Sequence, residues 1–205
     1  MKNLIGGLLL YSFALISCGD NSGGNKGVVV ENNNSESSNT VIPAKESSYT
    51  KTLQWTAYKM KEKVPVIGTF NSISLTNTQE EKPILESLQG AKFSCDGTTV
   101  STGDTARDGT LTAFFFKRLQ DTTIQGNFGK FENNKVPITF ILDGKTVTKV
   151  FDYTLKGKEL TIKGSIDILK DFGAEKAFTS LHRACYDLHE GKTWTEVDII
   201  AKISE

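Results

Sequence analysis

The sequence predicts an all-β fold, an eight-stranded antiparallel barrel with one or two helices packed on it. Apolar and polar residues alternate over much of the chain after residue 50, which is typical of strands with one buried face. Tight-turn signals at Asp143-Gly144 and Gly157-Lys158 join neighbouring strands, which must then be antiparallel. Eight antiparallel strands can close on themselves, and closure removes the exposed edges of the sheet.

The eight predicted strands follow one another within residues 51–205. The earlier four are expected at residues 51–62, 65–77, 90–101 and 121–132. The later four are the clearest, because each has a face of mainly apolar residues. Those four faces consist of Val136, Ile138, Phe140 and Leu142; Val147, Phe151, Tyr153 and Leu155; Leu160, Ile162, Ile166 and Ile168; and Val197, Ile199, Ala201 and Ile203.

Residues 174–190 interrupt the strand pattern and predict an amphipathic helix with Gly191 as its C-cap. Its apolar stripe consists of Ala174, Ala177, Phe178, Leu181, Ala184, Cys185 and Leu188. This stripe must be buried on the apolar face of the same domain, so we expect a barrel with an apolar interior.

Residues 105–119 predict a second helix, with Thr105 as its N-cap and Gly109 as a weak point. Its expected buried side consists of Leu111, Phe114, Phe115 and Leu119.

Cys18 marks the N-terminal region. It follows Leu15-Ile16-Ser17 at the end of an apolar run, behind the basic residue Lys2, and this pattern is typical of a secretory signal. The run over residues 4–16 is shorter than the roughly 20 residues that cross a bilayer. The residues around Cys18 resemble a bacterial lipobox, so we expect a lipoprotein signal peptide over residues 1–17 and lipidation of Cys18. An ordinary cleaved signal with a chance Cys is the alternative.

Residues 18–50 are expected to be the lipidated Cys and a flexible tether. Gly, Ser, Asn and charged residues dominate this stretch, and its one apolar cluster is Val28-Val29-Val30, too little to bury a core. Gly19 stands where an Asp would favour retention at the inner membrane by enterobacterial sorting rules. The expected location is therefore the bacterial cell envelope, anchored by lipid in the outer membrane and facing the periplasm.

The composition argues against nucleic-acid binding and catalysis. Lys and Arg together number 24, as do Asp and Glu, so the formal net charge is zero and no nucleic acid is expected as a partner. The sequence has no HExxH, GxSxG, P-loop or CxxC motif and no GxGxxG after a strand. We therefore expect no enzyme and no cofactor.

Three residues on the predicted 174–190 helix could hold zinc or copper, because His182, Cys185 and His189 lie along one side of it. However, the Cys falls within the apolar stripe and the two His lie on its border. No metal is therefore expected.

Cys95 and Cys185 remain once Cys18 is assigned to the anchor. Two thiols in an oxidising envelope can form a disulfide. Two buried free thiols that pack as small apolar residues are equally compatible with the sequence.

Aromatic residues spread over the predicted strands and the second helix. The interior of an eight-stranded barrel is either filled by side chains or holds one small ligand. The aromatic residues do not decide between these two states.

Four segments, taken in order, carry a family resemblance. Residues 52–75 contain a Gly-x-Phe pair, Gly68 and Phe70, and residues 106–119 contain an Arg-Asp-x-x-Leu pattern followed by paired Phe. Residues 160–173 end in Asp-Phe-Gly, and residues 189–203 close the chain with the stretch HEGKTWTEVDIIAKI. Together they resemble the YceI-like proteins, a periplasmic lipid-binding family with a lipocalin-like barrel, and the last segment resembles its lipoprotein branch.

The resemblance implies that residues 51–205 form a YceI-like β-barrel domain that binds a long amphiphile in an apolar interior. A polyisoprenoid, an isoprenoid quinone and a fatty amide are the implied ligand types, held by a carrier or sequestering protein without catalytic residues. The expected ligand pocket consists of Trp55, Tyr58, Phe70, Phe115, Phe116, Phe140, Phe151 and Tyr153. The candidates for contact with a polar head group are Arg107, Lys117 and Arg118.

Lys117 stands where the family has an acidic residue, which leaves the ligand open. The alternative function is that of a structural or partner-binding envelope lipoprotein with a filled barrel core. A homodimer is also left open by the sequence.

Overall fold

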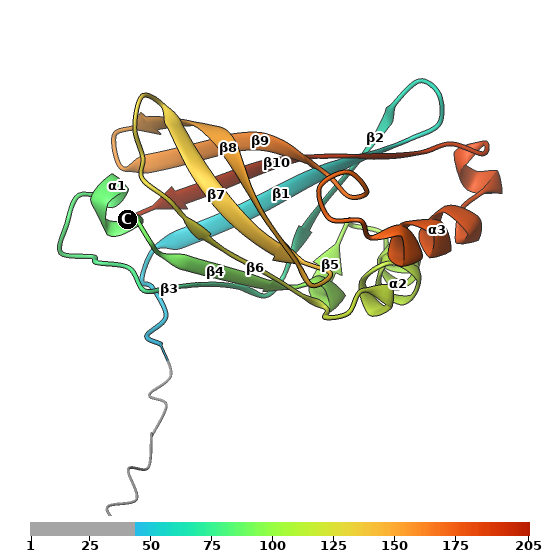
Figure 1. The fold of residues 1–205 in the computed structure, drawn as a ribbon, viewed down its shortest axis with the longest axis horizontal. Coiled ribbons are helices and arrows are strands. Elements are labelled where there is room, and N and C mark those ends of the chain that lie inside the picture. The colour runs from blue at the N-terminus through green and yellow to red at the C-terminus, as the bar shows by residue number, and fades with distance from the viewer. Residues whose placement is uncertain (1–43) are drawn as a thin grey trace, which may run out of the picture. The chain divides into compact units, whose positions relative to one another are not determined.

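Ten antiparallel strands form one curled sheet, a half-barrel that is visible in Figure 1. The computed structural model describes residues 44–205. The predicted signal peptide, Cys18 and most of the predicted tether therefore lie outside the described residues. The strands are β1 (Thr50–Lys59), β2 (Val64–Phe70), β3 (Ile73–Thr76), β4 (Lys92–Asp96), β5 (Val100–Ser101), β6 (Thr123–Phe128), β7 (Lys135–Leu142), β8 (Lys145–Lys156), β9 (Glu159–Asp167) and β10 (Thr193–Ser204). Their order in the sheet is β3-β4-β6-β7-β8-β9-β10-β1-β2-β5.

The sheet has ten strands rather than the predicted eight, because two of the eight predicted segments are interrupted. Asn71 and Ser72 separate β2 from β3, and the short 3-10 helix η1 (Gly97–Thr99) separates β4 from β5. Strand β2 pairs with β5, and β3 pairs with β4. The two predicted segments therefore supply both edges of the sheet: β3 pairs with β4 at one edge, and β2 pairs with β5 at the other.

The predicted turn at Asp143-Gly144 is confirmed. Both residues have positive φ, 49° and 72°, as a two-residue type I′ hairpin requires. The turn sets the register of β7 on β8, with Leu142 opposite Lys145. The apolar face predicted for β7 is buried as a result, from Val136 to Leu142.

Within the described part of the chain, three α-helices accompany the sheet: α1 (Ile84–Ser87), α2 (Thr105–Phe114) and α3 (Glu175–Ala184). The sequence did not predict α1. Helix α2 is followed by the 3-10 helix η2 (Phe116–Arg118), and α3 by η3 (Asp187–His189). The predicted N-cap of α2, Thr105, is wrong, because the side chain of Asp104 accepts hydrogen bonds from the backbone N–H groups of Ala106 and Arg107, at 3.0 and 3.1 Å.

Each of the two predicted helices is shorter than expected and ends in a 3-10 turn. Leu188, expected in the buried stripe, is 72% exposed, because α3 ends at Ala184 and the helical spacing ends with it. Phe114 at the end of α2 is 38% exposed. Gly191 ends the segment predicted at residues 174–190, with a φ of 71° and its N–H donating to the carbonyl of Tyr186.

The folded unit begins before residue 51, so the predicted tether is too long at its C-terminal end. Tyr49 is buried, and its hydroxyl donates to Oγ of Ser87 at 2.9 Å. The backbone N–H of Ser47 donates to the carbonyl of Leu75. Contacts within the chain place residues 44–205 in one compact unit.

No helix within residues 44–205 is long and apolar enough to cross a membrane.

Candidate functional site

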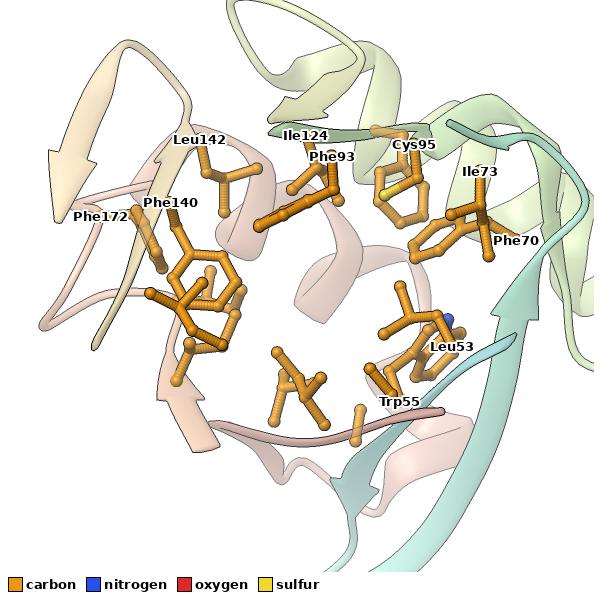
Figure 2. Close-up of a pocket in the computed structure, with 18 of the residues that line it drawn as sticks. Leu53, Trp55, Phe70, Ile73, Phe93, Cys95, Ile124, Phe140, Leu142 and Phe172 are labelled. Carbon is orange, nitrogen blue, oxygen red and sulfur yellow. The ribbon is translucent and has the colours of Figure 1, made fainter. Parts of the chain in front are cut away.

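The interior of the curled sheet contains a cavity of about 210 Å³. Figure 2 shows its wall, in which labelled side chains from several strands surround an open centre. The labelled residues are Leu53, Trp55, Phe70, Ile73, Phe93, Cys95, Ile124, Phe140, Leu142 and Phe172. The interior is therefore hollow, and the alternative of a filled barrel core does not describe residues 44–205.

The wall of the cavity is apolar. Apart from two indoles and one thiol, its polar side chains are Lys51, Thr52, Ser74 and Thr193. Lys51 is neutralised by Glu46, with 2.7 Å between Nζ and Oε1. No unpaired charge of the wall therefore faces the cavity, and an apolar ligand fits it best.

Strand alternation directs the apolar residues inward. Leu53, Trp55 and Ala57 of β1 line the cavity, as do Val197, Ile199 and Ala201 of the neighbouring β10. All but Trp55 of these are only partly buried although they lie on the inner face, since they border the hollow.

Helices α2 and α3 cover one end of the cavity. Leu111 of α2 and Phe178 and Leu181 of α3 contribute to its lining. Phe115 directly after α2 and Phe116 at the start of η2 pack edge to face with ring centroids 5.1 Å apart. Side chains from these helical segments and the adjoining turn therefore separate the cavity from solvent at this end.

Aromatic packing and α1 close the other end. Phe131 and Tyr153 pack edge to face at 5.3 Å, and Ile84 of α1 and Leu88, directly after α1, are buried. Figure 1 shows α1 at the end of the sheet opposite to α2 and α3. The cavity therefore lies between a packed end and an end covered by two helices.

Six of the eight predicted pocket residues line the cavity: Trp55, Phe70, Phe115, Phe116, Phe140 and Phe151. Tyr58 does not. Its hydroxyl donates to the carboxylate of Asp198, which raises the pKa of Tyr58. The preceding residue, Ala57, takes the inward position instead. Tyr153 is buried but packs on Phe131 beyond the cavity.

The predicted pocket contained only aromatic residues and omitted the aliphatic residues of the wall. Ile73, Ile124, Leu142, Ile166 and Leu181 line the cavity as well. The alternation of β7 and β9 and the helical stripe already contained part of this signal, because an inward face includes all of its apolar residues and not only the aromatic ones.

None of the three predicted head-group residues lines the cavity. Arg107 is exposed and pairs with Asp104 at 3.3 Å, within the first turn of α2. Lys117 and Arg118 lie on η2 and are exposed. These cations belong to the outer surface of the helical end.

Cys95 and Cys185 are free, buried thiols, so the disulfide that the sequence left open is not formed. Cys95 lines the cavity, and burial raises the pKa of its thiol to about 12. The pKa of Cys185 is also raised by burial. Both behave as small apolar residues, which is the other state that the sequence allowed.

His182 and His189 share one partner, Thr193. Nδ1 of each ring lies within hydrogen-bond distance of the Thr193 hydroxyl, at 3.1 and 2.9 Å. Burial, with smaller contributions from Lys59 and His182, lowers the pKa of His189. Within residues 44–205 no three His, Cys, Asp or Glu side chains are grouped so as to hold a metal ion.

Trp55 and Trp194 differ in how their indole N–H groups are satisfied. Nε1 of Trp194 donates to the carbonyl of Met60 at 2.7 Å, which holds the β1–β2 hairpin against β10. Nε1 of Trp55 is buried without a hydrogen-bond partner among the described residues.

Comparison with known proteins identifies the family of the chain that forms this cavity. The family model described as the YceI-like domain matches residues 41–204. No curated protein matches the chain in sequence.

Among solved structures, the chain is similar to a polyisoprenoid binding domain from Saccharophagus degradans implicated in plant cell wall breakdown. The TM-score is 0.52 and the identity 14%, and the match covers 75% of this chain and 93% of that one. It is also similar to BcnA of Burkholderia cenocepacia, with a TM-score of 0.50 and 18% identity over 76% and 96% of the two chains.

Proposed function

The chain belongs to the YceI-like family, and we propose that it binds a long amphiphile inside its half-barrel, as a carrier or sequestering protein and not as an enzyme. The ligand class comprises polyisoprenoids, isoprenoid quinones and fatty amides. The observation that carries this proposal is the hollow, apolar cavity between the sheet and helices α2 and α3.

Burial of hydrocarbon supplies the binding energy. Each buried methylene group contributes roughly 0.8 kcal/mol, so about five of them contribute roughly 4 kcal/mol before the loss of ligand freedom is subtracted. The wall offers few hydrogen-bonding groups, and specificity for a polar head inside the cavity is therefore weak. Chain length and shape are expected to select the ligand.

A structurally similar protein supports the polyisoprenoid member of this ligand class. The Saccharophagus degradans domain, which is described as polyisoprenoid binding, shares the fold of this chain. We extend that ligand class to this chain because its own cavity is apolar.

The same proposal includes attachment to the envelope. Residues 1–17 would act as a lipoprotein signal peptide, Cys18 would carry the lipid, and the domain would face the periplasm from the outer membrane. Long amphiphiles partition into membranes, so an anchor would keep the cavity close to its ligand.

Native mass spectrometry of residues 42–205, purified without detergent, tests the proposal. This part of the chain contains the whole sheet and its core. We expect an added mass in the lipid range that is released on denaturation. If the domain carries no lipid and also fails to bind added isoprenoids, isoprenoid quinones and fatty amides, the proposal is wrong.

A variant that fills the cavity makes the test specific. Ala201 lines the cavity, so Ala201→Phe should fill part of it and lower lipid occupancy. Val150→Phe is the matched control, because Val150 is 65% exposed on the outer face of β8. Equal lipid occupancy in the two variants would mean that the lipid binds elsewhere.

A further inference from the structure

We propose that the outer face of α2, η2 and α3 docks on an anionic lipid bilayer. A groove on this face, here called the basic groove, is lined by Phe114, Arg118, Glu175, Lys176, Thr179, Ser180, Arg183 and Ala184. It combines three cations with one carboxylate. Because the whole chain has a formal net charge of zero, this positive charge is a local concentration.

The cations of the basic groove are free to meet an external anion. Arg118, Lys176 and Arg183 form no ion pair within residues 44–205, and neither does the neighbouring Lys117. All four side chains belong to exposed residues. Charge complementarity therefore favours an anionic partner, and phospholipid head groups supply many such anions in one plane.

One exposed aromatic side chain lies among these cations. Phe114 lines the basic groove and is 38% exposed. Cations beside an exposed Phe are a combination found on helices that lie in a membrane interface, where the ring enters the head-group region. An acidic protein would satisfy the cations but would leave Phe114 without a matching pocket, so we assign a bilayer.

The same helices separate the cavity from solvent. Leu111 on the inner side of α2 and Phe178 and Leu181 on the inner side of α3 line the cavity. Docking through the outer side would therefore place the covered end of the cavity against the membrane. The docking surface goes beyond the proposed function and does not require that the cavity hold a ligand.

The proposed anchor allows this orientation. The described chain begins at the end of the sheet opposite to α2 and α3 (Figure 1). Ten-residue β1 is about 33 Å long. If Cys18 carries the lipid, residues 18–43 could span at most about 90 Å when fully extended. That reach exceeds the length of the strand, so the helical end can face the membrane that holds the anchor.

Vesicle co-sedimentation tests the proposal with the chain from residue 18 onward, carrying Cys18→Ser so that no acyl chain contributes. The probes are vesicles of phosphatidylcholine alone and of phosphatidylcholine mixed with phosphatidylglycerol. We expect binding to the mixed vesicles only, weakened by added salt because exposed charges are screened. Equal binding to both vesicles, or no binding to either, would overturn the proposal.

Paired variants locate the surface. Arg118→Gln with Arg183→Gln should weaken binding to the mixed vesicles by about fivefold per cation and roughly 25-fold together. Lys82→Gln with Lys156→Gln is the matched control, since both Lys are exposed, form no ion pair among the described residues and lie away from α2 and α3. An equal loss in the control would show that net charge acts without this surface, which contradicts the proposal.

Two further measurements distinguish the docking surface from the cavity and from a dimer interface. Ala201→Phe, which fills part of the cavity, should leave vesicle binding unchanged. If the natural chain does not bind vesicles but its lipid occupancy still falls in Ala201→Phe, only the docking surface is wrong. Analytical ultracentrifugation tests a second copy as the occupant. The chain could instead self-associate through this surface without binding vesicles. If the double variant Arg118→Gln, Arg183→Gln abolishes such self-association, the surface is a homodimer interface and the bilayer proposal is wrong.

Discussion

The indole ring of Trp55 lies directly against Gly68, its partner on the neighbouring strand β2. A Cβ atom at Gly68 would come within 2.6 Å of Cε2 and 2.8 Å of Cη2 of that ring. Phe70, two residues further along β2, lines the cavity beside Trp55. The Gly-x-Phe pair of the sequence thus has a physical reason, because Gly68 leaves room for the indole and Phe70 continues the same inner face.

We expect Gly68→Ala to destabilise the domain by about 1–3 kcal/mol, since the added methyl group overpacks the wall of the cavity. Denaturant unfolding measures this change. Gly109→Ala is the control, because no atom lies within 4 Å of a Cβ at this helical position. The control should gain about 0.5–1 kcal/mol from helix propensity. Unchanged stability in Gly68→Ala would mean that Trp55 is not held against β2.

Acid should loosen the N-terminal edge of the folded unit. The backbone N–H and the hydroxyl of Ser48 both donate to Glu80 at 2.7 Å and hold the pKa of that carboxyl at about 2. A depressed carboxyl pKa stabilises the fold above the unfolded value of about 4.3, and this contribution is lost as the pH falls towards 2.

Hydrogen exchange at the Ser48 amide measures this loosening. Protection should decrease between about pH 5 and pH 2 in the natural chain, whereas Glu80→Gln should show weaker protection with little dependence on pH. The exposed neighbour provides the control, as Glu81→Gln should behave like the natural chain. A pH profile that survives Glu80→Gln would assign the effect to another group.

The imidazole of His189 should make the domain less stable in mild acid. Its lowered folded pKa means that the unfolded chain binds more protons near pH 6. The stability contributed by the neutral ring is present above the unfolded value of about 6.5 and is lost as the pH falls through the folded pKa. We expect His189→Asn, which cannot titrate, to reduce the change in unfolding free energy between about pH 7.5 and 5. An unaltered profile would contradict this assignment.

Cys95 should resist alkylation in the folded protein. Its thiol has a pKa of about 12 because it is buried, so little thiolate exists at pH 8. Iodoacetamide is expected to modify Cys95 at least about a hundredfold more slowly in the native state than in urea. Mass spectrometry of the modified peptides measures both rates. Similar rates would show that the cavity wall opens frequently.

Local patterns predicted the elements well. The faces of β7, β8 and β9 repeat every second residue, and a strand pattern of this kind depends only on neighbours in sequence. Two of the predicted strands were nevertheless split, at Asn71-Ser72 and at Gly97, because these breaks depend on which strands meet at the edges of the sheet.

One pocket residue could have been corrected from the sequence itself. Tyr58 was predicted to enter the pocket together with Trp55, but residues three apart in a strand point to opposite faces. Leu53, Trp55 and Ala57 line the cavity, and Tyr58 instead donates to Asp198. Only the partner required the tertiary structure, because Asp198 lies 140 residues away on β10.

The sequence by itself determined the family, the mainly β fold, the order of the longer strands and of α2 and α3, and six aromatic residues of the cavity. These properties depend on residue types and short-range periodicity. The tertiary structure decided that the interior is hollow, that the two thiols are unpaired and that Arg118 meets Lys176 and Arg183 on the outer face. Each of these depends on the distance between residues far apart in the chain, and that distance is set by how strands and helices pack rather than by any local pattern.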